Sequence, residues 1–233
     1  MNYAIIAAGE GSRLVKEGID QPKPLVSLNG KPLIDRLVDI FLENDAESVS
    51  IIVNEEMIQV QEHLKRKKMN VPLNLVVKST PSSMHSFYEI SRFLKQGKFC
   101  LTTVDTIFKE EEFSGFIQSF IADKTYDGMM AVTEFVDDEK PLYVAVDDKM
   151  EITGFLDTPD GSEKYISGGI YCLSGNALPV LNYCLEYGIE RMRNYQRELI
   201  HKGLKLRVYP FGKILDVDHA GDIIKAEQFL LSL

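Results

Sequence analysis

Cysteine is scarce in this sequence of 233 residues. The three cysteines, Cys100, Cys172 and Cys184, are odd in number, widely spaced and set in apolar stretches such as "GKFCLTT" and "IYCLS". This pattern excludes a disulfide framework and a cysteine zinc site. It is typical of buried thiols in a reducing compartment.

Positive charge is also in short supply. The chain has 26 lysines and arginines against 35 aspartates and glutamates, which gives a formal net charge of −9. Nucleic acids and anionic membrane surfaces attract proteins through a basic field, so neither is an expected partner. An acidic protein that binds an anionic ligand must supply local cations, either as a few placed arginines and lysines or as a metal held by aspartates.

Long hydrophobic runs are missing as well. The apolar stretch near the N-terminus has only about six residues before the glycines, too short for a signal peptide, and no other stretch is long enough to cross a bilayer. We therefore expect a cytoplasmic protein. There are no repeats, linkers or low-complexity segments, and 45% apolar residues allow a substantial core, so we expect residues 1–233 to form one domain.

The first half of the chain alternates strand and helix patterns. Short apolar runs predict strands at 3–8, 48–54, 71–78 and 98–105, and apolar residues at helical spacing predict helices from Pro32, at 55–68 and at 83–95. Strands that alternate with helices indicate a parallel sheet covered on both faces.

From about Asp127 the pattern changes to β-rich stretches separated by turn residues. Strands are expected at 127–136, 141–148, 151–157, 165–173 and 205–211, with helices at 177–186, 190–202 and from about 220. This half predicts a mixed or antiparallel sheet. We accordingly divide the domain into halves of about 1–125 and 126–233.

The stretch "AAGEGSRL" at residues 7–14 ends the first predicted strand. Gly9 and Gly11 allow backbone conformations closed to other residues and leave N–H groups free to approach phosphate oxygens. Arg13 adds a planar positive fork that suits phosphate. The dinucleotide-binding fingerprint is not met, because the third glycine and a tight following helix are missing, and no P-loop Gly-Lys-Ser/Thr follows.

Residues 4–34, "AIIAAGEGSRLVKEGIDQPKPLVSLNGKPLI", closely resemble the N-terminal signature of the sugar-phosphate nucleotidyltransferases. That signature runs L-A-A-G-x-G-(S/T)-R-L, a spacer, P-K-P-L, and G-K-P-(L/M)-I. The resemblance implies that Arg13 and Lys23 are catalytic, holding the triphosphate and stabilising charge at the attacked α-phosphorus. Pro22 and Pro24 restrict the backbone around Lys23, which helps to aim its ammonium group. The implied nucleotide-binding residues of the loop are Ala8, Gly9, Glu10, Gly11 and Ser12.

The resemblance also implies a Mg²⁺ site. The predicted strand "KFCLTTVD" ends in Asp105, where the family has a metal-binding aspartate after a glycine that is Val104 here. Late in the chain, "KILDVDHAGD" resembles the family's W-x-D-(I/V)-(G/D)-T segment, without its tryptophan and with His219 in place of threonine. It supplies Asp216 as the second ligand, and side-chain alternation puts Asp218 on the same face if the strand continues. Carboxylate oxygens are ligands that Mg²⁺ prefers.

The remaining binding residues are assigned by segment. "STPSSMHS" lies where the family has a base-reading turn, so Ser82 and Ser83 are further nucleotide-binding candidates, while His85 is interpreted as a packed or exposed histidine. "GFLDTP" lies where many members have an acidic residue and a lysine, so Asp157 is an acceptor-binding candidate and Thr158 leaves the lysine's charge missing. Lys164 and Lys78 are the candidates to replace it. "ISGGIYCL" matches a family segment that makes Gly169 an acceptor-binding candidate, and Glu134 is a third.

These assignments predict a Rossmann-like nucleotidyltransferase core, similar to that of GT-A enzymes, with a mixed central sheet and helices on both faces. The implied reaction transfers a nucleoside monophosphate from a nucleoside triphosphate to a sugar 1-phosphate or a related phosphorylated alcohol such as phosphocholine, with release of pyrophosphate. Two other hypotheses stay open. One is a metal-dependent glycosyltransferase of related fold, and the other is a non-catalytic nucleotide-binding module.

Overall fold

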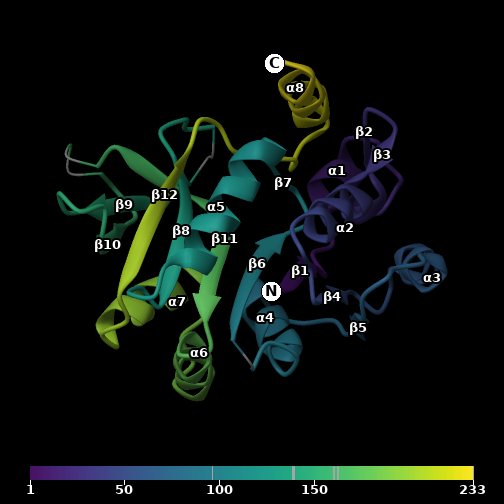
Figure 1. Ribbon diagram of the computed structural model, residues 1–233. Helices are drawn as coiled ribbons and strands as arrows, with labels where there is room; N and C mark the ends of the chain where they lie inside the picture. Colours follow the sequence, from purple (N-terminus) through teal and green to yellow (C-terminus); the bar gives the residue numbers. More distant parts are fainter. Residues whose placement is uncertain (96, 138–139, 160, 162, 233) are drawn as a thin grey trace.

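A mixed β-sheet runs through the centre of the molecule (Figure 1). The structure is a computed structural model and describes residues 1–95, 97–137, 140–159, 161 and 163–232. Within these residues the main sheet has nine strands, in the order β10-β9-β11-β6-β1-β4-β5, with β8 paired to β11 and β12 paired to β8. Their bounds are β1 Asn2–Ala7, β4 Ser48–Val53, β5 Leu73–Val77, β6 Lys98–Thr103, β8 Gly128–Thr133, β9 Tyr143–Val146, β10 Ile152–Leu156, β11 Tyr165–Ser174 and β12 Leu206–Phe211.

Strands β1, β4, β5 and β6 are all parallel, as the alternation of strands and helices predicts. Strand β1 lies between β4 and β6, and its side chains alternate between two cores. Tyr3 and Ile5 join one hydrophobic cluster, and Ala4 and Ile6 join the other. A strand buried on both faces needs apolar residues at every position, which explains the continuous run in the sequence.

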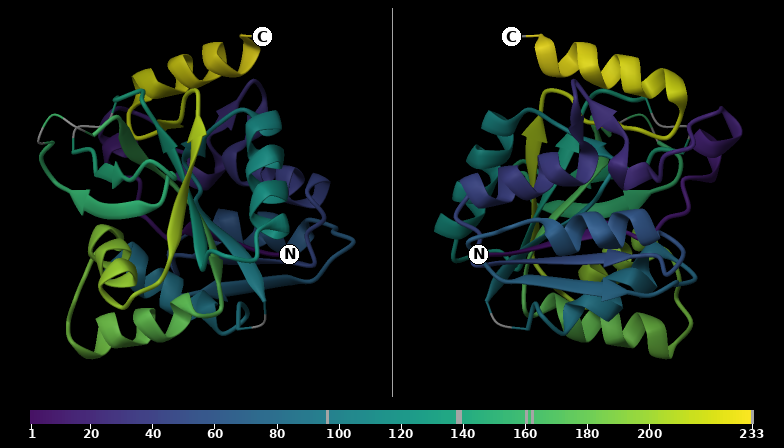
Figure 2. Two further views of the ribbon diagram at one scale, coloured as in Figure 1. Left: turned by 60° about the vertical axis from the view of Figure 1, so that its left-hand side comes forward. Right: turned by 90° about the vertical axis from the view of Figure 1, so that its right-hand side faces the viewer.

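Helices cover both faces of the sheet (Figures 1 and 2). The cluster of Tyr3 contains side chains from α2 (Leu33–Glu43), α3 (Ile58–Arg66), α5 (Glu110–Ala122) and α8 (Ala220–Leu231). The cluster of Ala4 contains side chains from α4 (Ser83–Ser91), α6 (Ala177–Glu186) and α7 (Met192–His201). All three cysteines are buried and unbridged, as predicted. Among the described residues, every helix is too short or too polar to serve as a membrane span.

The second half of the chain continues the same sheet with mixed directions, as predicted. Strand β11 is antiparallel to β6, β8 and β9, whereas β12 is parallel to β8. The pairing of β11 with β8 shifts register between Ser167 and Tyr171. The two glycines there, Gly168 and Gly169, lie at the interruption, and Gly169 has a φ of 74°.

The sequence analysis did not predict helices α1 (Ser12–Lys16) and α5. We expected no helix directly after the glycine loop, but α1 begins there. Helix α5 was not identified, although Phe113, Phe116 and Phe120 bury one of its faces. Short elements complete the chain: a 3-10 turn η1 (Lys23–Leu25), the pair β2 (Ser27–Leu28) and β3 (Lys31–Pro32), and the pair β7 (Thr106–Ile107) and β13 (Leu215–Asp216).

The topology gathers the polar residues that follow the parallel strands. The loop after β1, Asn54 after β4 and Asp105 after β6 all lie at the carboxyl edge of the sheet, where open α/β folds bind ligands. Helix α8 crosses one end of the molecule in both views of Figure 2. The backbone N–H of Asn29 donates to Oε1 of Glu227 at 2.9 Å, which ties this helix to the β2–β3 turn.

Candidate active site

The loop after β1 is shaped by Gly11. Its φ of 64° and ψ of 26° are left-handed, and it forms the N-cap of α1. A Cβ atom at Gly11 would lie 3.1 Å from Cβ of Lys23, so both the backbone and the space favour glycine. At Gly9 an added Cβ would meet nothing within 4 Å. The protein itself therefore leaves the space over Gly9 open to a ligand.

Lys23 lies at the centre of a charged cluster. The 3-10 turn after Pro22 carries it, and the residue is buried despite its charge. Its ammonium group donates to Oδ2 of Asp105, and to Oδ1 of Asp218 at 2.6 Å. Arg13 donates from Nη1 to Oδ2 of Asp218 at 2.9 Å. The structure thus brings together the two residues predicted to be catalytic and two of the three predicted metal ligands.

Electrostatics favour the charged forms of Lys23 and Asp218. Burial alone would lower the pKa of Lys23, but the charge of Asp105 and the hydrogen bonds to Asp105 and Asp218 raise that pKa overall. Burial would raise the pKa of Asp218, but the hydrogen bond and charge of Lys23, with the charge of Arg13, lower it overall. Lys23 is thus a fixed cation to which a phosphate could bind in place of one carboxylate partner.

The two distant aspartate segments meet at the sheet edge. β13 pairs with β7 through Asp216 and Thr106, and the N–H of Val217 donates to the carbonyl oxygen of Asp105 at 3.1 Å. Alternation places Val217 in the core, between Asp216, which is exposed, and Asp218, which is half-buried. Asp218 is the aspartate that meets Asp105, through Lys23, whereas Asp216 lines a neighbouring cavity that Asp218 also borders. That Asp105 and Asp216 share one ion stays a prediction.

Within the described residues, no group of three or more histidine, cysteine, aspartate or glutamate side chains is already arranged around a metal position. Two carboxylates nevertheless converge on one buried cation, the ammonium of Lys23. Hard carboxylate oxygens fit Mg²⁺, and an ion beside Asp105 would compete with this ammonium.

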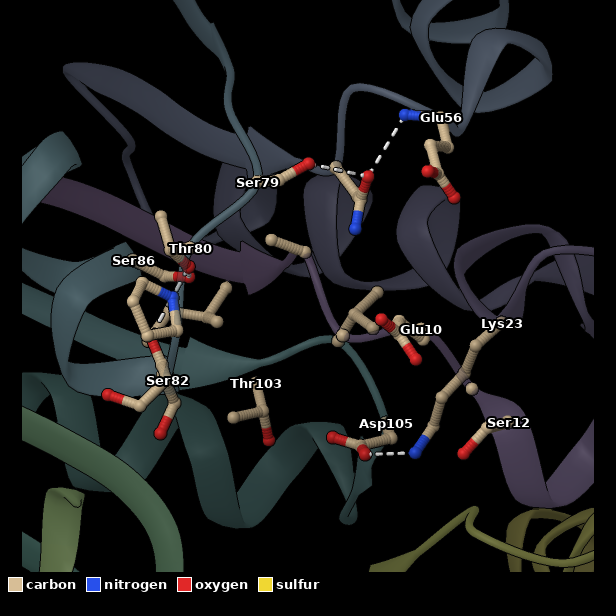
Figure 3. A pocket seen from close by; sticks show the side chains of 18 of the residues that line it. Glu10, Ser12, Lys23, Glu56, Ser79, Thr80, Ser82, Ser86, Thr103 and Asp105 are labelled. Atoms are coloured by element: carbon tan, nitrogen blue, oxygen red, sulfur yellow. Dashed lines mark hydrogen bonds and ion pairs between the residues drawn. The ribbon is translucent and has the colours of Figure 1, made fainter.

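The first cavity, of about 590 Å³, extends from this cluster to the start of α4. Figure 3 shows Ser12 and Lys23 on one side of it and Thr80, Ser82 and Ser86 on the other. All the residues predicted to bind the nucleotide line it: Ala8, Gly9, Glu10, Gly11, Ser12, Ser82 and Ser83.

Ser82 caps α4, since its Oγ accepts from the backbone N–H of His85 and pairs with Nδ1 of His85 at 2.8 Å. His85 is half-buried and serves this cap, in keeping with its interpretation as a packed residue. Polar residues of the cavity wall that the sequence analysis missed include Asn54, Glu56, Ser79 and Thr80. Asn54 ends the predicted strand "SVSIIVN", and its position at the strand end was the signal that could have identified it.

A second cavity, of about 370 Å³, lies on the other side of the charged cluster. Arg13 and Asp218 border both cavities. Apart from Arg13, the residues that line the second cavity come from the second half of the chain, among them Thr133, Gly168, Asp216 and Lys225. Gly168 leaves no room for a side chain, because an added Cβ would lie 2.2 Å from Cδ1 of Ile214.

The predicted acceptor-binding residues do not converge. Gly169 adjoins Gly168 of the second cavity, and an added Cβ there would lie 3.5 Å from Oγ1 of Thr106. Glu134 pairs with Lys164 at 2.8 Å. Asp157 lies on a third cavity, between Arg193 and Arg197. Of the two lysines proposed to replace the missing charge, Lys164 is thus paired with Glu134, and Lys78 with Glu89 at 2.6 Å.

Comparisons with known proteins identify the family and the fold. A family model described as nucleotidyl transferase matches residues 3–214. Over 238 residues the chain is 23% identical to the bifunctional protein GlmU of Methanococcus maripaludis strain C7, an alignment that covers 100% of this chain and 55% of that protein. The chain spans about half the length of the curated relatives it matches first.

Two solved structures share the fold. The inositol-1-phosphate CTP transferase from T. maritima superimposes with a TM-score of 0.79 and 18% identity, covering 99% of this chain and 98% of that one. A putative glucose-1-phosphate thymidylyltransferase from Bacillus anthracis, in complex with a sucrose, gives a TM-score of 0.85 and 18% identity, covering 100% and 96%. The predicted Rossmann-like nucleotidyltransferase fold with a mixed central sheet is confirmed.

Proposed function

The chain belongs to the nucleotidyl transferase family, and we propose that it transfers a nucleoside monophosphate from a nucleoside triphosphate to a small phosphorylated acceptor, with release of pyrophosphate. The acceptor is a sugar 1-phosphate or a related phosphorylated alcohol. One observation carries the proposal: Arg13 borders two cavities, one beside the glycine loop and one lined mostly by the second half of the chain, and Lys23, which shares Asp218 with Arg13, lines the first.

The first cavity is assigned to the triphosphate and its base. The backbone around Gly9 and Gly11 lets phosphate oxygens approach closely, and Ser82 and Ser83 at the start of α4 face the far end. The second cavity, which shares Arg13 with the first, is assigned to the acceptor. An acceptor phosphate there faces the α-phosphorus across the charged cluster.

The chemistry requires positioning and charge neutralisation. Attack on the α-phosphorus builds negative charge on its equatorial oxygens and on the leaving pyrophosphate, and fixed cations stabilise that charge. Lys23 is held by the restricted backbone of "PKPL" and stays protonated. Arg13 presents its guanidinium from α1 beside it. The phosphates would replace Asp218 as the partner of both side chains.

Mg²⁺ is the proposed cofactor, held by Asp105 and Asp216 with Asp218 beside them. When bound, it would neutralise charge on the triphosphate. The cytoplasmic location and the single-domain organisation stay predictions from the sequence.

The test is a pyrophosphate-release screen. Each of the four nucleoside triphosphates is combined with sugar 1-phosphates and alcohol phosphates in the presence of Mg²⁺, and products are identified by mass. We expect one nucleotide and one acceptor class to give pyrophosphate together with a nucleotide-linked product. Lys23→Met should abolish the signal, whereas the exposed Lys65→Met should not.

Two outcomes would overturn the proposal. Saturable nucleotide binding without pyrophosphate release from any pair would indicate a binding module. Consumption of a nucleotide sugar without pyrophosphate release would indicate a glycosyltransferase of related fold.

A further inference from the structure

A third cavity, of about 800 Å³, lies where β10 ends and α7 begins. Four basic side chains line it against two acidic ones, although the chain as a whole carries a net charge of −9. The basic residues are Lys140, Arg191, Arg193 and Arg197, and the acidic ones are Asp157 and Glu190. This concentration of positive charge is distinct from the Arg13 and Lys23 cluster.

Hydrogen bonds to uncharged oxygen atoms of the protein hold two of these arginines in place. Arg193 donates from Nη2 to the carbonyl oxygen of Lys140 at 2.9 Å. Arg197 donates from Nε to the carbonyl oxygen of Phe155 at 3.1 Å, and from Nη1 to Oδ1 of Asn194 at 2.9 Å. Their guanidinium groups are therefore ordered before any ligand arrives, which reduces the entropy lost on binding.

The carboxylate of Asp157 already pairs with both guanidinium groups. Asp157 accepts from Nη1 of Arg193 at 2.6 Å and pairs with Nη2 of Arg197 at 2.9 Å. These hydrogen bonds, from Arg197 first and Arg193 second, lower the pKa of Asp157, whose side chain is 57% exposed. One carboxylate balances only one of the two guanidinium charges, so one excess positive charge remains. The pairing also shows that the two arginines can bind a carboxylate or a similar anion.

Arg191 adds a further cation at the edge of the cavity. Its φ of 74° with ψ of 141° is unfavourable for a residue with a side chain. In the part of the chain that the structure describes, no hydrogen-bond or ion-pair partner is found for its guanidinium. A strained backbone that presents a side chain to a cavity is characteristic of binding sites.

The third cavity adjoins the proposed acceptor cavity, since Lys140 borders both. An acceptor whose reacting phosphate lies beside Arg13 and Asp216 can therefore extend toward Arg193.

We infer that the third cavity binds an acid group, a carboxylate or a phosphate, carried by the acceptor at the end away from its reacting phosphate. The substrate class is thus an acceptor with two acid groups. This inference rests on the proposed function for the identity of the ligand, but the anion site itself can be tested without turnover.

The first experiment measures anion binding directly. Inorganic phosphate is titrated into the protein while the arginine Nε–H resonances are followed by NMR. We expect saturable shifts of Arg193 and Arg197, lost in the double variant Arg193→Gln/Arg197→Gln and retained in Arg66→Gln, an exposed control on α3. Asp157→Asn should tighten phosphate binding several-fold, because it removes the competing carboxylate.

A purely structural role for the arginines makes the opposite prediction. Asp157→Asn would then lower the melting temperature as much as the double variant does, without any gain in phosphate binding. That result, or phosphate binding that survives the double variant, would overturn the inference.

The second experiment uses matched acceptors that differ by one carboxylate: glucuronic acid 1-phosphate with glucose 1-phosphate, and phosphoserine with phosphoethanolamine. We expect the ratio of kcat/KM for the acidic member to that for the neutral member to fall about tenfold or more in the double variant. An unchanged ratio would reject the link to the acceptor. Phosphate binding at the arginines without turnover of any acceptor would refute nucleotidyl transfer and assign the cavity to a free anion.

Discussion

Nζ of Lys23 lies 2.6 Å from Oδ1 of Asp218, although 195 residues separate the two in the chain. The same ammonium donates to Asp105, so one buried cation joins the glycine-loop segment, the end of β6 and the segment before α8. Carboxylates that converge without a cation would repel each other, so Lys23 stabilises the arrangement in the absence of ligands.

Removal of either cation should slow the reaction strongly. Lys23→Ala and Arg13→Ala each remove a positive charge from the developing transition state, and turnover should fall about 100-fold or more. The measurement is pyrophosphate release with the substrate pair found in the screen, and circular dichroism checks that each variant folds. Turnover within about twofold of the wild type in either variant would remove that residue from the mechanism.

Much of the fold could be predicted from the sequence because its strands are buried on both faces. The run at Tyr3–Ala8 is apolar at every position, and Val49–Val53 is buried throughout with Ser50 as its one polar residue, as a covered parallel sheet requires. Helix α5 was missed because its three phenylalanines are spread along a segment that starts with three glutamates, and the strand before it ends in a short turn through β7.

The nucleotide side of the site could be predicted for a related reason. Its residues follow predicted strands directly or belong to one contiguous signature, as Gly9, Lys23 and Asp105 do. The acceptor side could not, because it is assembled from side chains of β8, β11 and β13 whose order in space depends on tertiary pairing. Arg193 and Arg197, four residues apart on α7, meet Asp157 only because α7 packs against the end of β10.

The two loop glycines should respond differently to substitution. Gly11→Ala places a side chain at a φ of 64° and 3.1 Å from Cβ of Lys23, so it should lower the free energy of unfolding by about 1–2 kcal/mol. Gly9→Ala meets open space and should leave stability unchanged, yet weaken nucleotide binding where the ligand packs over the loop. Urea unfolding and nucleotide titration calorimetry measure the two effects. Equal stability losses in both variants would contradict this account of the loop.

The carboxylate of Asp35, which lies away from the candidate active site, gives a prediction for how stability depends on pH. Burial alone would raise the pKa of Asp35, but its hydrogen bonds to His63 and Lys67 lower the pKa below 3.8. A depressed folded-state pKa stabilises the protein above the unfolded value, and that contribution is lost as pH falls through the folded value. Asp35→Asn should therefore reduce stability by about 1 kcal/mol or less at pH 5, and by less as pH falls below 3.8.

Urea unfolding of the wild type and Asp35→Asn between pH 5 and pH 2.5 measures this difference. Glu62→Gln is the control, because its carboxylate is 55% exposed and pairs with Arg66 on the same helix. A stability difference that stays constant across the range would show that Asp35 acts through packing and not through its charge.

Metal binding should depend on the nucleotide in the wild type. Lys23 occupies the space between Asp105 and Asp218, so a divalent ion added alone must displace a buried, hydrogen-bonded ammonium. A triphosphate attracts Lys23 and Arg13 to its own oxygens and leaves the carboxylates to the ion. We expect Mn²⁺, followed by electron paramagnetic resonance, to bind tightly only when a non-hydrolysable nucleotide is present.

Substitutions can distinguish the role of Lys23, which blocks the proposed metal site, from that of the aspartates proposed to bind the metal. Lys23→Met should bind Mn²⁺ without nucleotide, because Asp105 then loses its ammonium partner and Asp218 keeps only the exposed Arg13. Asp105→Asn and Asp216→Asn should each lose metal binding and metal-dependent turnover, but keep part of their nucleotide affinity through Arg13, Lys23 and the loop amides. If Asp216→Asn binds Mn²⁺ as the wild type does, the ligand set is Asp105 with Asp218, and the match of "KILDVDHAGD" to the family segment is shifted by two residues. If no variant alters Mn²⁺ binding, the carboxylates do not hold the ion, and the catalytic proposal loses its metal site.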